Sequence, residues 1–192
     1  MDEKLYPFMN GGDAHLYLRG SVVPAQGLFL PGSFNPVHVG HQGLLDAAIE
    51  VSGRSGCLEL SIENPDKPAL DVGALVDRLA GMPEKMPVVL TRAPTFLEKA
   101  ELFPEAWFAM GYDTARRLLD PRYYADVPAM LERFLALESR FVVAGRLHQG
   151  VYHCLDRLPI ESRYRSLFIP ISETRFRQDI SSTELRADWA RD

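Results

Sequence analysis

The chain has 192 residues, of which 46% are hydrophobic and 24% are charged, the composition of an ordinary soluble globular protein. Its net charge is −5, from 21 basic and 26 acidic residues, and it contains no long basic run, which argues against a general nucleic-acid or membrane-surface role. It shows no signal-peptide pattern and no apolar run long enough to span a bilayer, and its two cysteines form no metal or disulfide pattern. We therefore expect a cytoplasmic protein with no membrane and no nucleic-acid partner.

The first 26 residues are expected to form an N-terminal extension, ahead of a main domain that covers residues 27–192. Within the extension, residues 15–18 alternate in hydropathy. That pattern is typical of a short edge strand or of a fragment of helix, and it does not decide between these two structures.

Short apolar runs alternate with segments of helical periodicity along the rest of the chain. The predicted strands are residues 28–30, 57–62, 87–91, 107–110, 140–144 and 167–169. The predicted helices cover about 41–53, 69–80, a short segment after Thr95, 114–119, 127–138 and a final helix that begins near residue 181. This alternation predicts an α/β fold, a Rossmann-like, doubly wound parallel sheet of five to six strands with flanking helices.

A strand, a turn of small residues and the start of a helix follow one another between residues 28 and 41. The free N–H groups and the dipole at a helix N-terminus behind a strand favour an anion there. His38 and His41 are three residues apart and share one face of that first helical turn, and Gly40 between them lets a ligand approach the backbone. The segment therefore predicts a site that binds phosphate.

The same segment resembles the signature G-S-F-N-P-x-H-x-G-H of the HxGH nucleotidyltransferase superfamily, in the form found in nicotinamide- and nicotinate-mononucleotide adenylyltransferases. The matching positions are Gly32, Ser33, Phe34, Asn35, Pro36, His38, Gly40 and His41. The resemblance implies that His38 and His41 are the catalytic residues, which bind the phosphates and the transition state. It also implies that the ATP site includes Gly32, Ser33, Phe34 and Gly40.

A second segment, residues 180–186, places three hydroxyl side chains at a predicted helix start with an arginine on the same face. Alone it is typical of an ordinary helix cap. It also resembles the I-S-S-T-x-x-R signature of the same superfamily, which contacts the ATP phosphates. The resemblance therefore adds these residues to the ATP site: Ser181, Ser182, Thr183 and Arg186.

Four further residues are assigned to the mononucleotide by the resemblance: Asn35, Lys67, Asp113 and Arg146. Three of them also have a plain structural alternative. Asp113 fits the cap of the next helix, Lys67 fits a solvated turn, and Arg146 fits a surface ion pair. No side-chain cluster predicts a protein-bound metal, and Mg²⁺ is expected only as the cation that accompanies ATP.

The resemblance implies an enzyme of NAD biosynthesis that joins ATP and nicotinamide or nicotinate mononucleotide into the dinucleotide and releases pyrophosphate. The partners are then small-molecule substrates, and a homo-oligomer is left open. The alternatives are a cytidylyl- or phosphopantetheine-type member of the superfamily, or a nucleotide-binding protein without catalysis. The cytidylyl branch usually carries Asp at the position of Asn35, which counts against it. The sequence contains no P-loop, no G-x-G-x-x-G after a strand and no H-E-x-x-H.

Overall fold

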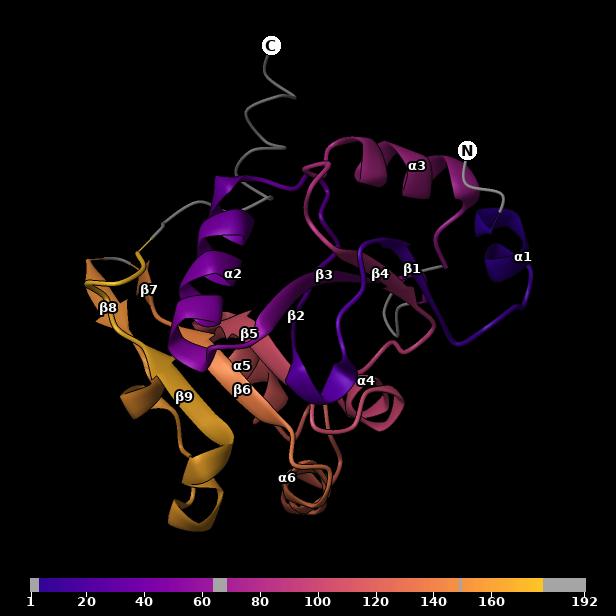
Figure 1. Ribbon diagram of the computed structural model, residues 1–192. Coiled ribbons are helices and arrows are strands. Elements are labelled where there is room, and N and C mark those ends of the chain that lie inside the picture. The colour runs from indigo at the N-terminus through magenta and orange to yellow at the C-terminus, as the bar shows by residue number, and fades with distance from the viewer. Residues whose placement is uncertain (1–3, 64–68, 149, 178–192) are drawn as a thin grey trace.

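A seven-stranded sheet forms the centre of the computed structural model, which describes residues 4–63, 69–148 and 150–177 (Figure 1). The strand order is β1-β4-β3-β2-β5-β6-β9. The bounds are β1 His15–Arg19, β2 Gly27–Pro31, β3 Ser55–Ser61, β4 Val88–Thr91, β5 Trp107–Gly111, β6 Arg140–Ala144 and β9 Phe168–Ile171. All neighbouring strands are parallel except β1, which pairs antiparallel with β4. The predicted doubly wound α/β fold is confirmed, and the sheet has seven strands instead of the predicted five to six because β1 joins it as an antiparallel edge strand.

Helices cover both faces of the sheet. One face packs against α1 (Leu5–Met9), α2 (Val39–Ser52) and α3 (Val72–Ala80). The other packs against α4 (Phe96–Leu102), α5 (Tyr112–Leu118), α6 (Val127–Ala136) and two of the short 3₁₀ turns, η2 (Leu155–Arg157) and η3 (Ser162–Leu167). A further 3₁₀ turn, η1 (Pro24–Gln26), leads into β2. No helix in the described ranges is long and apolar enough to cross a membrane.

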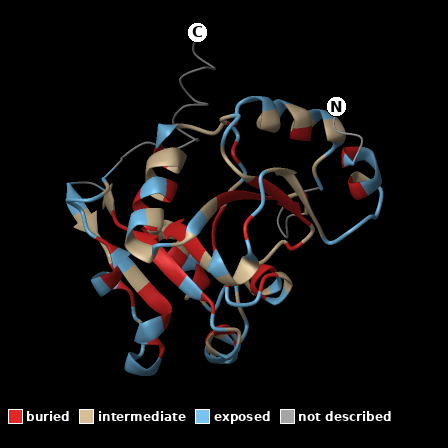
Figure 2. Cartoon of the chain, in the orientation of Figure 1, coloured by how far each residue is buried: buried red, intermediate tan, exposed pale blue. Residues whose placement is uncertain are grey.

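The core consists of two apolar layers, one on each side of the sheet. Figure 2 shows that buried residues run along the central strands. Along β2, Leu28 and Leu30 belong to the layer under α1–α3, whereas Phe29 belongs to the layer under α4–α6. Successive side chains of a strand point to opposite faces, and a parallel sheet is covered on both, so its central strands are apolar throughout. This is why β2 is predicted by a continuous apolar run.

Glycine ends α2 as the sequence predicts. Gly53 has a positive φ of 68° and its N–H donates to the carbonyl of Ile49 at 2.8 Å, the usual left-handed helix ending. The short helix expected after Thr95 is α4, and Thr95 caps it, since its hydroxyl accepts from the N–H of Glu98 while the Glu98 carboxylate accepts from the N–H of Thr95.

The N-terminal segment is bound to the rest of the fold by two arginines. Residues 15–19 form the edge strand β1, one of the two predicted alternatives. Arg92, just after β4, donates to the carbonyls of Phe8 and Met9, and Arg19 of β1 donates to the carbonyls of Leu79, Met82 and Pro83 at 2.8–3.1 Å. The segment before residue 27 therefore completes the sheet at one edge.

Residues 147–166 show little periodicity in the sequence but contain regular structure. A two-stranded hairpin, β7 (Arg146–His148) and β8 (Val151–His153), follows β6 and is separate from the main sheet. Three-residue strands are too short to leave a clear alternation pattern.

The strand order reverses between β2 and β5. From β2 the chain moves outward through β3 and β4, then returns to the other side of β2 with β5 and moves outward through β6 and β9. In such sheets a crevice opens at the carboxyl ends of the strands beside this switch point, and ligands bind there. The segment that follows β2 lies at this position.

Candidate functional site

The loop between β2 and α2 is held in a tight form. The N–H of Gly32 donates to the carbonyl of Glu59 in β3 at 3.0 Å, and Phe34 is buried with a left-handed φ of 44°. The Phe34 ring lies directly over Gly32, where a Cβ atom would come within 2.8 Å of two ring carbons. Glycine at position 32 is therefore required by the packing of Phe34.

His38 and His41 cap the start of α2. The Nδ1 atom of His38 accepts from the N–H of Gly40 at 3.1 Å, and the Nδ1 atom of His41 accepts from the N–H of His38 at 3.2 Å. The two ring centroids are 3.8 Å apart. A neutral imidazole that accepts at Nδ1 carries its proton at Nε2. The backbone therefore leaves both histidines with an Nε2–H donor at the helix N-terminus.

Both imidazoles are neutral at neutral pH. Burial lowers the pKa of His38, and burial together with the neighbouring His38 lowers the pKa of His41 to about 4. A neutral imidazole with its proton at Nε2 still donates a hydrogen bond to a phosphate oxygen, and a group with so low a pKa holds little proton to transfer near neutral pH. The pair is thus suited to binding anions rather than to acid–base catalysis.

The lowered pKa of His41 makes the stability of the fold depend on pH. The unfolded chain binds a proton to this group below about pH 6.5, whereas the folded chain does so only near pH 4, so stability falls as the pH drops through that window. We expect the free energy of unfolding to be about 1–2 kcal/mol lower at pH 5 than at pH 7 because of this residue. Urea denaturation of the wild type and of His41→Asn at the two pH values measures the effect, and equal pH dependence of the two proteins would contradict it.

A cavity of about 670 Å³ lies at the carboxyl ends of β2, β3 and β4, next to the loop before α2. Its volume is in the range of small-molecule sites. Its walls combine loop residues before α2, cationic side chains and aromatic rings. The lining residues include Gly32, Ser33, Asn35, Glu59, Arg78, Phe96, Lys99, Arg117, Tyr123 and Tyr124.

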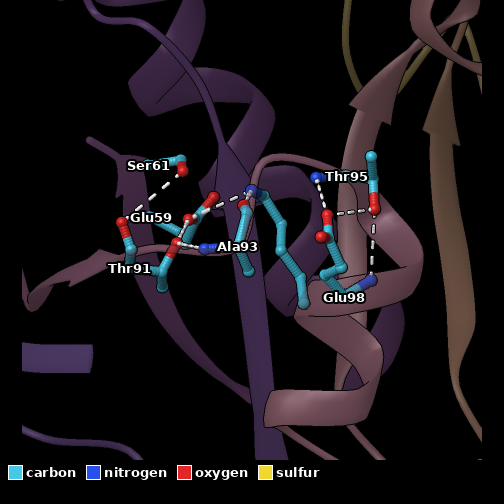
Figure 3. A network of polar contacts seen from close by, with 7 residues as sticks. Glu59, Ser61, Thr91, Ala93, Thr95 and Glu98 are labelled. Carbon is cyan, nitrogen blue, oxygen red and sulfur yellow. Dashed lines mark hydrogen bonds and ion pairs between the residues drawn. The ribbon is translucent and has the colours of Figure 1, made fainter. Parts of the chain in front are cut away.

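A buried ion pair forms part of the cavity wall (Figure 3). Glu59 of β3 is 1% exposed and Lys99 of α4 is 4% exposed, and the Lys99 ammonium lies 3.3 Å from Oε1 of Glu59. The Thr91 hydroxyl also donates to Oε1, at 2.5 Å, and Lys99 donates in addition to the carbonyl of Ala93. Burial raises the pKa of Glu59, and Lys99 and Thr91 oppose that effect.

Asp113 and Arg146 form an ion pair, with 2.8 Å between an Arg146 guanidinium nitrogen and Oδ2 of Asp113. Asp113 lies in the first turn of α5 and Arg146 begins β7, so both follow the carboxyl ends of neighbouring strands, β5 and β6. Each side chain is about 40% exposed, and such pairs contribute little stability. Gly111, not Asp113, occupies the cap position of α5.

The loop residues predicted for the site lie together at the carboxyl end of the central strand β2. Gly32, Ser33 and Asn35 line the cavity, Phe34 is buried beneath the loop, and Gly40 is buried in the first turn of α2. Lys67, Ser181, Ser182, Thr183 and Arg186 lie outside the described residues. The ligands assigned to all these residues stay predictions.

Glu59 and Lys99 were not singled out from the sequence as site residues. Alternation within residues 57–62 suggests a strand with one exposed face, and on that pattern Glu59 is an ordinary surface residue. The signal that could have found it is a carboxylate in the middle of a strand expected to be covered on both sides.

Comparison with known proteins gives a likeness to solved structures but no match at the level of sequence. No protein-family model matches the sequence, and no curated protein matches it. Among solved structures, the chain is similar to Plasmodium falciparum nicotinic acid mononucleotide adenylyltransferase complexed with NaAD, at 18% identity and a TM-score of 0.48, over 84% of this chain and 82% of that chain. The chain itself has a doubly wound, Rossmann-like α/β fold with a cavity at its switch point.

Proposed function

We propose that the protein is a nucleotidyltransferase, and specifically an adenylyltransferase that joins ATP and nicotinamide or nicotinate mononucleotide and releases pyrophosphate. The observation that carries the proposal is the histidine pair at the N-terminus of α2. Two neutral imidazoles with Nε2–H donors and Gly40 between them suit the binding of polyanions. Neither histidine lines the cavity, but the loop that leads to them does, through Gly32, Ser33 and Asn35. They lie within the segment that resembles the signature of the HxGH nucleotidyltransferases.

In this reaction the phosphate of the mononucleotide attacks the α-phosphorus of ATP. A phosphate monoester has a second pKa of about 6, so the nucleophile is already mostly ionised at neutral pH and requires no strong base. The protein has to hold two polyanions in line and stabilise the charge that develops on the leaving pyrophosphate. His38 and His41 suit that task because they are neutral donors at a helix N-terminus.

The two substrates would occupy the two sides of the loop before α2. ATP would place its phosphates at His38, Gly40 and His41, with Ser181, Ser182, Thr183 and Arg186 as further ligands by the resemblance. The mononucleotide would occupy the cavity on the Asn35 side, with Lys67, Asp113 and Arg146 as further candidates. Mg²⁺ would enter bound to the ATP phosphates and screen their charge.

The proposal is tested by pyrophosphate release, measured with ATP or CTP as the donor and a panel of phosphate acceptors. We expect release with ATP and a pyridine mononucleotide only. Turnover with CTP or with phosphopantetheine would point to another branch of the superfamily. Tight ATP binding by calorimetry without turnover on any acceptor would support a nucleotide-binding protein without catalysis.

A further inference from the structure

We propose that Glu59 and Lys99 together select the nicotinamide form of the mononucleotide over the nicotinate form. This inference rests on the proposed function and deepens it, because it names which of two closely related acceptors the cavity prefers. The two acceptors differ at one group: the first carries a neutral carboxamide on its ring and the second carries a carboxylate.

The first observation is a polar atom that the fold leaves unsatisfied. Glu59 Oε1 receives both the Thr91 hydroxyl and the Lys99 ammonium. Glu59 Oε2 is also buried and has no hydrogen-bond partner among the described residues. Buried carboxylate oxygens are rarely left without a donor, because the lost hydration is costly. Since Glu59 lines the cavity, an occupant of the cavity can supply the missing donor.

The second observation concerns Lys99. An ammonium group has three N–H donors, and the described part of the chain supplies two acceptors for them, the carbonyl of Ala93 and Oε1 of Glu59. Lys99 also lines the cavity, so its third donor can reach an occupant. The wall therefore offers one buried acceptor and one buried donor, Glu59 and Lys99, whose Oε1 and Nζ atoms are 3.3 Å apart.

A carboxamide complements this pair of groups. Its carbonyl oxygen accepts from Lys99 while its NH₂ donates to Oε2 of Glu59, and all three partners are then satisfied. A carboxylate can accept from Lys99, but it has no proton to donate and places a second negative charge against Glu59. A buried site built for a donor rejects an analogue that lacks it, because its own polar groups are then left unpaired.

The experiment measures kcat/KM for both mononucleotides at saturating ATP, and their dissociation constants by calorimetry, for the wild type and for Glu59→Gln. We expect the wild type to prefer nicotinamide mononucleotide by about tenfold or more. In Glu59→Gln the side-chain amide can donate to a carboxylate, so the preference should fall by about tenfold, while the KM for ATP stays the same. A general loss of folding would lower both efficiencies equally and leave their ratio unchanged.

Glu101→Gln is the matched control. Glu101 lies on the same helix as Lys99, is exposed and pairs with Arg133 at 3.1 Å. The substitution also removes one negative charge, but at a residue that does not line the cavity. The ratio of the two efficiencies should therefore stay as in the wild type. If Glu59→Gln does not fold, the ratio measured for the wild type remains the test, because equal use of the two mononucleotides already contradicts the inference.

Three results would overturn the inference. A wild type that uses both mononucleotides equally, or that prefers nicotinate, contradicts it while leaving the proposed function intact. An unchanged ratio in a folded Glu59→Gln protein contradicts it in the same way. A wild type that neither binds nor converts either mononucleotide removes the proposed function, and the inference with it.

Discussion

Replacing His41 by alanine is expected to lower kcat/KM by about 10²–10³-fold while the fold is retained, because the transition state loses one preorganised hydrogen-bond donor. The donor is the Nε2–H of an imidazole whose Nδ1 accepts from the backbone of His38, so its direction is set by the fold. The lost cap costs about 1 kcal/mol of stability, which is too little to unfold a domain of this size. Steady-state kinetics and thermal unfolding measure the two effects separately.

His148→Ala is a suitable control, because this histidine lies on the β7–β8 hairpin, has an exposed side chain and does not line the cavity. It should keep wild-type activity. Near-normal turnover in folded His41→Ala would remove the basis for placing the transferred phosphate at the start of α2.

The largest expected change in stability comes from Lys99→Met. Removing the lysine leaves the Glu59 carboxyl buried without its counter-ion, and breaking a buried pair typically costs about 3–5 kcal/mol. Glu59 then has a folded pKa above its unfolded value, so the cost should grow as the pH rises and shrink in acid, where the carboxyl is protonated. Urea denaturation at several pH values measures both trends.

The double variant Glu59→Gln/Lys99→Met separates the ion pair from simple packing. Replacing both charges together removes the uncompensated carboxylate, so most of the lost stability should return. If the double variant were less stable than Lys99→Met by the full cost of Glu59→Gln alone, the two residues would contribute independently, and a coupled buried pair would be ruled out.

Much of the fold can be predicted from local pattern. The six parallel strands are continuous or alternating apolar runs, and Gly53 and Thr95 mark helix ends through their own backbone and side-chain chemistry. The edge strand β1 could not be chosen over a helix fragment, because its identity depends on pairing with β4, about seventy residues away.

The candidate site is only partly predictable for the same reason. The spacing of His38 and His41 places them together on one helical turn, which any sequence analysis can anticipate. The Glu59–Lys99 pair forms only because α4 packs against the sheet beside β3, and the Asp113–Arg146 pair joins the ends of β5 and β6. Such contacts between distant segments follow from strand order, which apolar patterns alone do not specify.

The most direct measurement is product analysis by chromatography and mass spectrometry after the wild-type protein is incubated with Mg²⁺, ATP and each pyridine mononucleotide in turn. We expect the dinucleotide and pyrophosphate to form in equal amounts, with no phosphate released from ATP alone. Folded protein that binds ATP but forms no dinucleotide from either mononucleotide would contradict the proposed function.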